Sequence, residues 1–234
     1  MKKILSILLV STVALGLIAC SNERNDVGDS TANQKPTNTE DSINNDFFVN
    51  RDGKVLIAYF SMPEDRDVDN VDAVSGASIV VKDNQVFGNV EYIANVINKT
   101  IGGNLFQIKT EEDYPLNHEA LVDRAAQEQD DNARPVISTH VENIDAYDTI
   151  FLGYPNWWGD MPQALYTFLE EYDLSGKAII PFCPHGGSGF SNTINTIEEL
   201  QPNAIISEYG LSIPRDDVVN SEDTIVKWLN DLEF

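Results

Sequence analysis

The chain has 234 residues, of which 15 are basic and 38 acidic, giving a formal net charge of −23. This length suits one good-sized domain with appendages. Because so acidic a chain repels nucleic acid and anionic lipid head groups, we exclude both as partners bound through charge. The two cysteines, Cys20 and Cys183, allow no intramolecular disulfide framework if Cys20 is modified.

Residues 1–19 have the pattern of a secretory signal. Lys2 and Lys3 precede a mostly apolar run up to Ile18, which is shorter than the roughly 20 residues that comfortably span a membrane. The run ends in Leu-Ile-Ala-Cys, which resembles the bacterial lipoprotein box. We therefore expect cleavage after residue 19 and lipidation of Cys20, the alternative being an ordinary signal with a chance cysteine. Loss of the two lysines would take the charge from −23 to −25.

The segment that follows the signal is rich in Asn, Asp, Ser and Thr and has few large apolar side chains. Such a segment buries too little to offset its ordering entropy. We predict a disordered tether over 20–50, which carries a folded domain over 51–234. The expected location is extracytoplasmic, with the membrane contacted only through the lipid anchor.

From about residue 53, strand-like apolar runs alternate with amphipathic helical segments, as in a parallel sheet with helical crossovers. Helices are predicted over 90–101 and 119–129, after Pro162, around 194–200, and after Ser221, which is expected to cap the last one. An insertion at about 62–87 contains a predicted hairpin that turns at 83–84. Five strands are predicted: 55–60, 105–109, 149–153, 177–182 and 204–207, the last with a continuation at 211–213. This alternation predicts a doubly wound, three-layer α/β domain.

Three loops should meet at one edge of this sheet. The first strand ends at Ser61, and after the insertion Gly88, Asn89 and Val90 open the first long helix. Backbone N–H groups and the helix dipole there would suit a phosphate. The alternative is that Asn89 only caps the helix and Gly88 only permits the turn. Neither the triphosphatase nor the dinucleotide glycine fingerprint is present.

The second loop follows the central strand at 149–153. In an open α/β sheet, ligands bind beyond the carboxyl ends of the strands. Two adjacent aromatic side chains there favour a flat ligand such as a flavin ring, the alternative being that both fill the end of the sheet as core. The candidate residues are Pro155, Asn156, Trp157, Trp158 and Gly159.

The third loop follows the fourth strand. Its glycines let the backbone approach a ligand edge closely. The histidine is a weak candidate for proton relay, and the run nearly matches the hydrolase motif Gly-x-Ser-x-Gly but ends in phenylalanine, which argues against a nucleophilic serine. The candidate residues are His185, Gly186, Gly187, Ser188 and Gly189.

Together these segments resemble the flavodoxin-like family, in particular its bacterial lipoprotein members. The resemblance covers roughly residues 53–234, and the Tyr-Pro-Asn-Trp-Trp-Gly element at 154–159 is its most specific piece. It implies a five-stranded parallel sheet in the order 2-1-3-4-5 and FMN as the cofactor. It further implies that the first loop holds the phosphate, that residues 155–159 flank the isoalloxazine ring, and that Gly186 to Gly189 line its other edge.

One feature departs from the family pattern. Ordinary flavodoxins run directly from the first strand into a Ser/Thr-rich phosphate loop, whereas residues 62–87 split that loop here. Val90 stands where a phosphate-binding threonine is expected. A hydroxyl is therefore missing unless Ser75 or Ser78 folds back to replace it.

Three functions remain open from the sequence. The first is an FMN-dependent redox protein, either an electron carrier or a reductase using NAD(P)H or quinone, with a redox protein or a small molecule as its donor and acceptor. The second is a non-catalytic scaffold lipoprotein that has lost FMN. An esterase using Ser188 and His185 ranks last. No metal site is expected, because the calcium-like run from Asp65 to Asp69 lacks its glycine at Asn70.

Overall fold

The computed structural model describes residues 54–63, 73–74, 78–82 and 84–232. The predicted signal, Cys20, the tether and the run from Asp65 to Asn70 lie outside these residues. Within the described part of the chain, no helix is long and apolar enough to cross a membrane.

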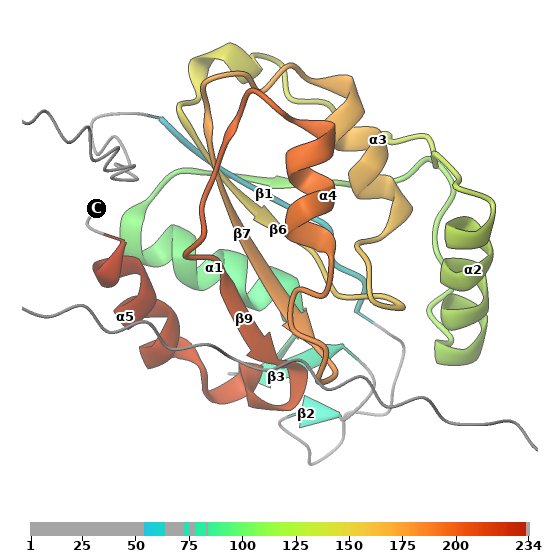
Figure 1. Cartoon of the computed structure of the whole chain (residues 1–234). Helices are drawn as coiled ribbons and strands as arrows, with labels where there is room; N and C mark the ends of the chain where they lie inside the picture. The colour runs from blue at the N-terminus through green and yellow to red at the C-terminus, as the bar shows by residue number, and fades with distance from the viewer. Residues whose placement is uncertain (1–53, 64–72, 75–77, 83, 233–234) are drawn as a thin grey trace, which may run out of the picture. The chain divides into compact units, whose positions relative to one another are not determined.

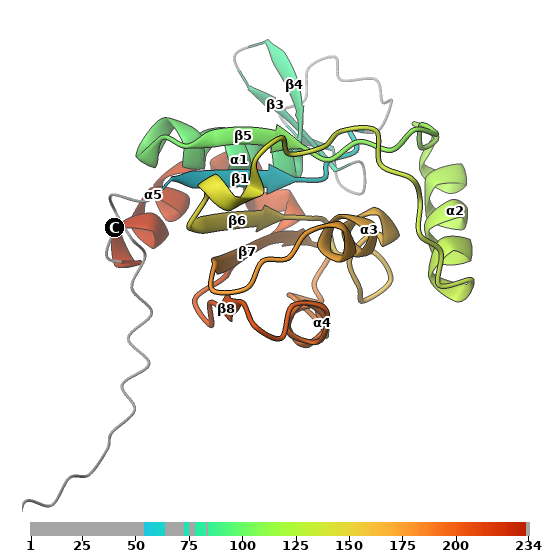
Figure 2. The ribbon, with the colours of Figure 1, turned by 90° about the horizontal axis from the view of Figure 1, so that it is seen from above.

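The main sheet has six strands, all paired in parallel, in the order β5-β1-β6-β7-β8, with β9 also pairing with β7 (Figures 1 and 2). Numbered as the five predicted strands, this order is 2-1-3-4-5, so the predicted flavodoxin-like α/β fold is confirmed. The strands are β1 (Val55–Tyr59), β5 (Asn104–Gln107), β6 (Thr149–Gly153), β7 (Ala178–His185), β8 (Ile205–Ile206) and β9 (Leu211–Pro214).

The predicted fifth strand is divided in two. β8 pairs with the start of β7, and β9 pairs with its end. The Ser207 N–H donates to the Ile179 carbonyl at 2.9 Å. The next donor on the same side of β7 would be residue 181, which is a proline without an N–H. The ladder therefore breaks at Pro181 and resumes at Phe182, which pairs with Leu211.

Helices cover both faces of the sheet. Alternate residues of each strand enter different cores: Ile57 and Phe151 pack with α1 and α5, whereas Leu56 and Ile150 pack with α3 and α4. Figure 1 shows α1 and α5 on one side of the strands and α3 and α4 on the other, and Figure 2 looks onto the face of the sheet that α3 and α4 cover. The helices are α1 (Asn89–Ile101), α2 (His118–Asp130), α3 (Gln163–Glu171), α4 (Thr193–Leu200) and α5 (Glu222–Asp231), with 3-10 turns η1 (Ile144–Ala146) and η2 (Arg215–Asn220).

Helix α2 does not lie on a face of the sheet. It lies beyond the carboxyl ends of the strands (Figures 1 and 2). Its buried residues are Leu121, Ala125 and Glu128, whereas Val122 and Ala126, which were predicted to point inward, are only half-buried. This narrow buried stripe lets α2 line the edge where a ligand would bind.

The insertion forms a small antiparallel sheet of β2 (Ala73–Val74), β3 (Ile79–Lys82) and β4 (Gln85–Gly88). The predicted hairpin is therefore confirmed, with β2 as an addition. β4 runs directly into α1 without a loop. Ser221 occupies the N-cap position of α5, as predicted, but its side chain does not cap the helix: the hydroxyl donates to the carbonyl of Val218 in η2 at 2.7 Å.

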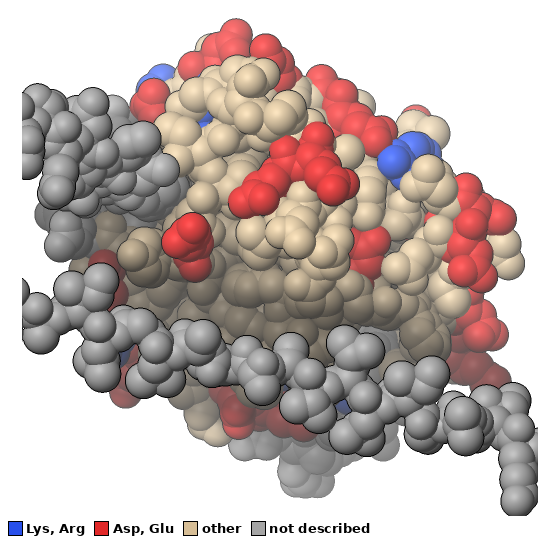
Figure 3. Space-filling view, in the orientation of Figure 1, with Lys and Arg blue, Asp and Glu red and all other residues tan. Residues whose placement is uncertain are grey.

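Acidic side chains are spread over the face that α3 and α4 present, and basic ones are few on that face (Figure 3). Glu170 and Glu171 on α3, and Glu198 and Glu199 on α4, are all exposed. Part of the excess of acidic residues is therefore carried on this face.

Candidate functional site

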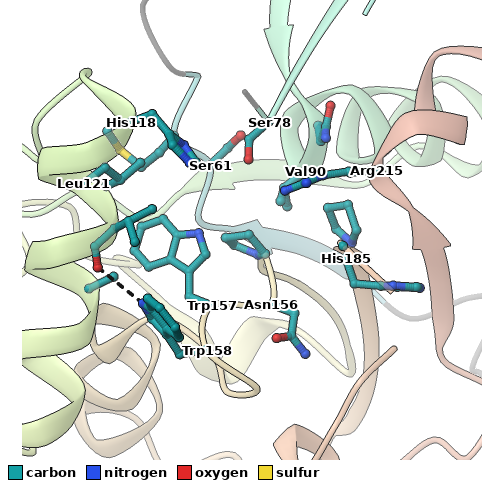
Figure 4. A pocket seen from close by; sticks show the side chains of 17 residues that line it. Ser61, Ser78, Val90, His118, Leu121, Asn156, Trp157, Trp158, His185 and Arg215 are labelled. Atoms are coloured by element: carbon teal, nitrogen blue, oxygen red, sulfur yellow. Dashed lines mark hydrogen bonds between the residues drawn. The ribbon is translucent and has the colours of Figure 1, made fainter. Parts of the chain in front are cut away.

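A cavity of about 190 Å³ opens at the carboxyl edge of the central strands (Figure 4). Five of the predicted site residues do not line it: Gly88, Gly159, Gly187, Ser188 and Gly189. The predicted residues that do line it are Ser61, Asn89, Val90, Pro155, Asn156, Trp157, Trp158, His185 and Gly186. The structure thus brings the three predicted loops to one cavity.

Ser61 and Gly88 together form the N-terminal cap of α1. Gly88 occupies the N-cap position of α1 and has no side chain to cap it. Ser61 Oγ instead accepts a hydrogen bond from the Glu91 N–H at 3.3 Å. A Cβ added to Gly88 would lie 2.0 Å from Ser61 Oγ, so the serine fills the space of the missing capping side chain. The alternative that Asn89 caps the helix is therefore wrong.

Asn89 and Ser78 complete this side of the cavity. Asn89 is 4% exposed, and its side-chain oxygen has no hydrogen-bond partner in the structure. Its backbone N–H donates to the Ser78 carbonyl at 2.8 Å. Ser78 lines the cavity, so the insertion does fold back and return a hydroxyl to it. Ser75, the other residue predicted for this role, is outside the described residues.

The two tryptophans of the second loop have different environments. Trp157 packs edge-on against Phe60 and Tyr114, with ring centroids 5.5 and 5.7 Å apart. Trp158 is 61% exposed and donates its indole N–H to the Val122 carbonyl of α2 at 3.3 Å. The core interpretation therefore holds in part for Trp157 and is wrong for Trp158.

The backbone at Trp158 is unusual. Residues 157 and 160 exchange two backbone hydrogen bonds, of 2.8 and 3.0 Å, around a two-residue turn. Both central residues have positive φ, 55° at Trp158 and 80° at Gly159, as in a type I′ turn. That turn favours Asn-Gly, and a bulky residue at positive φ is a strained outlier.

Asn156 holds the second and third loops together. Its Nδ2 donates to the Gly189 carbonyl at 2.9 Å and to Ser191 Oγ at 3.0 Å. Its Oδ1 accepts from the Gly159 N–H at 3.0 Å. Gly159 and Gly189 thus belong to the frame around the cavity and do not line it.

His185 stabilises its own loop. Its Nδ1 accepts a hydrogen bond from the Gly187 N–H at 2.9 Å, and burial lowers the pKa of the imidazole. Both effects favour the neutral ring with its proton on Nε2. Among the described residues no hydrogen bond joins His185 to Ser188, so the serine–histidine pair that an esterase requires is not assembled.

Among the residues that the structure describes, no carboxylate lines the cavity, although the chain is strongly acidic. None of its described lining residues is Asp or Glu, and its ionisable side chains are Arg215, His118 and His185. Among the described residues no group of acidic, histidine and cysteine side chains could hold a metal ion. The lining therefore favours a neutral or anionic organic ligand.

The flavodoxin family model matches residues 78–232, more than half of the chain. The chain belongs to the flavodoxin family. Among solved structures, a proposed flavoprotein from Bacteroides eggerthii is 26% identical, with 77% of this chain and 98% of that chain covered and a TM-score of 0.58. A second, from Bacteroides uniformis, is 24% identical over 76% of this chain and 98% of that chain, with a TM-score of 0.53. No curated protein matches the chain.

Several lining residues of this flavodoxin-family site were not foreseen. Arg215 directly follows β9, whose last residue pairs with His185, so the parallel register alone places Arg215 at this edge. The α2 residues could not be found in this way, since their pattern equally suits a helix on the sheet face. The residues missed are Met62, His118, Leu121, Val122, Ala125, Pro184 and Arg215.

A larger cavity, of about 910 Å³, lies at the opposite edge of the sheet beside β5. It is lined by Lys54, His140, Glu142 and Tyr147 among others. Ligands of open α/β sheets bind at the carboxyl edge, where the switch in strand order opens a crevice. The smaller cavity is therefore the candidate site of this flavodoxin-family protein.

Proposed function

We propose that this flavodoxin-family protein binds FMN and works in electron transfer or FMN-dependent reduction. The proposal is supported by family membership and by a cavity formed where three loops meet at the carboxyl edge of a 2-1-3-4-5 sheet. When bound, the flavin would supply the electron- or hydride-transfer chemistry, and the protein would orient it and tune its environment.

The observation that carries this proposal is the conformation of Trp158. A non-glycine residue in so unfavourable a backbone region costs on the order of 1–3 kcal/mol. The side chain offers little compensating burial, since it is 61% exposed, and its one hydrogen bond, to the Val122 carbonyl, is 3.3 Å long. Strain at an exposed aromatic residue beside a cavity indicates a binding role, because neither packing nor turn preference accounts for it.

Other groups fit the same ligand. The buried Asn89 oxygen needs a donor, which a ribityl hydroxyl can supply. The absence of carboxylates from the described lining suits a phosphate-bearing molecule. A cavity of about 190 Å³ encloses only part of a nucleotide, so the remainder would lie outside it, against Trp158.

A scaffold that no longer holds FMN is the second candidate. The observation that favours it is the split first loop, where two of the first amides of α1 are already bonded. The Asn89 N–H donates to Ser78 and the Glu91 N–H donates to Ser61. Fewer amides are therefore free for a phosphate than at an open helix N-terminus.

One measurement separates the two candidates. The full-length protein is purified in detergent, mixed with excess FMN and desalted, and its visible absorption spectrum is recorded. Retained flavin bands support the FMN protein, whereas a colourless protein supports the scaffold. Oxidation of NAD(P)H by the loaded protein with added quinone then identifies a reductase, and absence of turnover identifies a carrier.

We also propose that the domain is held at the outer face of the cytoplasmic membrane by lipidated Cys20. The Leu-Ile-Ala-Cys sequence after an apolar run supports this location. Metabolic labelling with a radioactive fatty acid should mark the wild-type protein and leave the Cys20→Ala variant unlabelled. Equal labelling of both would contradict the anchor.

A further inference from the structure

Arg215 supplies the permanent positive charge of the described cavity lining. The other ionisable side chains there are His118 and His185, and burial keeps the pKa of His185 below its usual value. The chain has a net charge of −23, yet Arg215 lies in a cavity whose described lining contains no carboxylate. Its surroundings favour an anion.

The position of Arg215 is fixed by the sheet. Pro214 ends β9 and pairs with His185 at the end of β7, so Arg215 follows beside Gly186. A Cβ added to Gly186 would lie 3.6 Å from both Cζ and Nη1 of Arg215. The guanidinium therefore packs against the Gly186 backbone. Figure 4 shows Arg215 on the side of the cavity that holds Val90 and His185, across from Trp157.

The guanidinium keeps its donors available. Among the described residues, no hydrogen bond or ion pair involves the Arg215 side chain, which is only half-buried. The other two arginines of the described chain, Arg124 and Arg134, each pair with a glutamate. A planar fork of free N–H donors is the arrangement that binds phosphate in a bidentate manner.

The first loop, by contrast, has few donors left. The Asn89 and Glu91 amides are bonded to Ser78 and Ser61, and the Gly88 N–H donates to the Glu91 carboxylate at 3.2 Å. The Val90 N–H has no partner among the described residues. A carboxylate in this first turn also offsets the favourable helix dipole.

We propose that Arg215 recognises the phosphate of the bound flavin nucleotide. In this assignment the guanidinium of Arg215 supplies the positive charge of an anion site. The Val90 N–H and the Ser61 and Ser78 hydroxyls supply its other hydrogen-bond donors. The inference rests on the proposed function, since it takes FMN as the ligand. It explains how the protein recognises a phosphate although Val90 replaces the expected threonine.

The test compares FMN with riboflavin, which lacks the phosphate, by quenching of flavin fluorescence. The full-length wild-type protein is compared with Arg215→Gln and with Lys109→Gln, which removes the same charge from an exposed position outside the cavity. We expect Arg215→Gln to weaken FMN binding about 10- to 100-fold, as loss of a charge-assisted hydrogen bond predicts, and to leave riboflavin binding unchanged. Lys109→Gln should leave both affinities unchanged.

Two further measurements support the assignment. FMN affinity of the wild type should fall as salt is raised, and this salt dependence should be weaker in Arg215→Gln. Arg215→Lys should retain part of the preference for FMN over riboflavin that Arg215→Gln loses. Lysine keeps the positive charge but lacks the planar set of N–H donors of a guanidinium. Circular dichroism of each variant checks that it is folded.

The proposal is overturned if Arg215→Gln binds FMN as tightly as wild type, or if it weakens FMN and riboflavin equally, which would place the arginine on the ring. If the wild type binds neither flavin, the proposed function fails as well. Wild-type FMN binding with an unaffected Arg215→Gln variant overturns the arginine assignment alone.

Discussion

At the scale of single residues, we expect Trp158 to favour ligand binding at the expense of folding stability. Its side chain is exposed and its backbone lies in the left-handed region, at a turn position where asparagine is preferred. Such a residue costs folding free energy and is retained where a ligand uses it.

Replacement of Trp158 should therefore separate the two properties. In Trp158→Asn we expect the free energy of unfolding to be unchanged or raised by about 0.5–1 kcal/mol, because asparagine tolerates positive φ. FMN binding should fall about tenfold or more. The matched variant Trp157→Ala should lower the unfolding free energy by about 2–4 kcal/mol, since it removes packing against Phe60 and Tyr114. Urea unfolding with flavin titration measures both, and FMN binding by Trp158→Asn at wild-type strength would refute the role of Trp158.

Ser61 carries a second prediction at this scale. Because its Oγ acts as the N-cap of α1 from the end of β1, Ser61→Ala should destabilise the protein by about 1 kcal/mol. The same change at Ser188, which lies outside the cavity, should cost much less. Denaturant unfolding of the two variants checks this, and equal stabilities would show that Ser61 does not cap α1.

At the scale of elements, one ionic cluster joins the insertion to two helices. Glu222 of α5 pairs with Lys82 of β3 and with Lys99 of α1, each at 2.9 Å. Lys82 Nζ also donates to the Tyr92 hydroxyl at 2.7 Å. The hydrogen bonds from Lys99 and Lys82 lower the pKa of Glu222 to about 2.

This cluster predicts a pH-dependent stability. A depressed carboxyl pKa contributes stability that is present above the usual pKa of glutamate and is lost as pH falls toward 2. Glu222→Gln should cost at most about 1 kcal/mol at pH 7, because the pair is partly exposed. The difference from wild type should shrink steadily below about pH 4.5. Denaturant unfolding between pH 7 and 3 tests this, with Glu198→Gln on α4 as control. A difference that stays constant over this range would contradict the pairing.

Much of the fold could be predicted at this scale because hydrophobic periodicity and strand ends are local signals. The alternation of strands and helices, the hairpin and the meeting of three loops followed from them, whereas the strand order followed from the resemblance to the flavodoxin-like family. The division of the fifth strand arises because the backbone nitrogen of Pro181, which carries no hydrogen, faces β8 within the sheet. Hydrophobic periodicity does not reveal which neighbouring strand a backbone nitrogen faces. The position of α2 and the capping of α1 by Ser61 are tertiary contacts between segments distant in sequence. Arg215 could have been found, because it directly follows a strand at the same edge.

At the scale of the whole molecule, we expect the acidic surface and the cavity, whose described lining contains no carboxylate, to act on different partners. The long-range field of a chain with net charge −23 steers approaching molecules, whereas the cavity selects what binds. The exposed glutamates on α3 and α4 place negative charge on one broad face (Figure 3).

This separation predicts opposite salt effects on electron transfer. The rate at which the reduced, FMN-loaded protein transfers electrons to a cationic metal complex should fall as ionic strength rises. The rate with an anionic complex of similar potential should rise. Stopped-flow measurements at low and high salt test this, and a faster reaction with the anionic complex at low salt would show that the local charge of Arg215 dominates.

FMN binding is tested most directly by an equilibrium titration of FMN with the wild-type, full-length protein, followed by flavin fluorescence. We predict saturable quenching with one FMN per chain at micromolar protein or below, because an aromatic side chain beside the ring and a specific phosphate contact act together. Unchanged fluorescence at micromolar protein would contradict it.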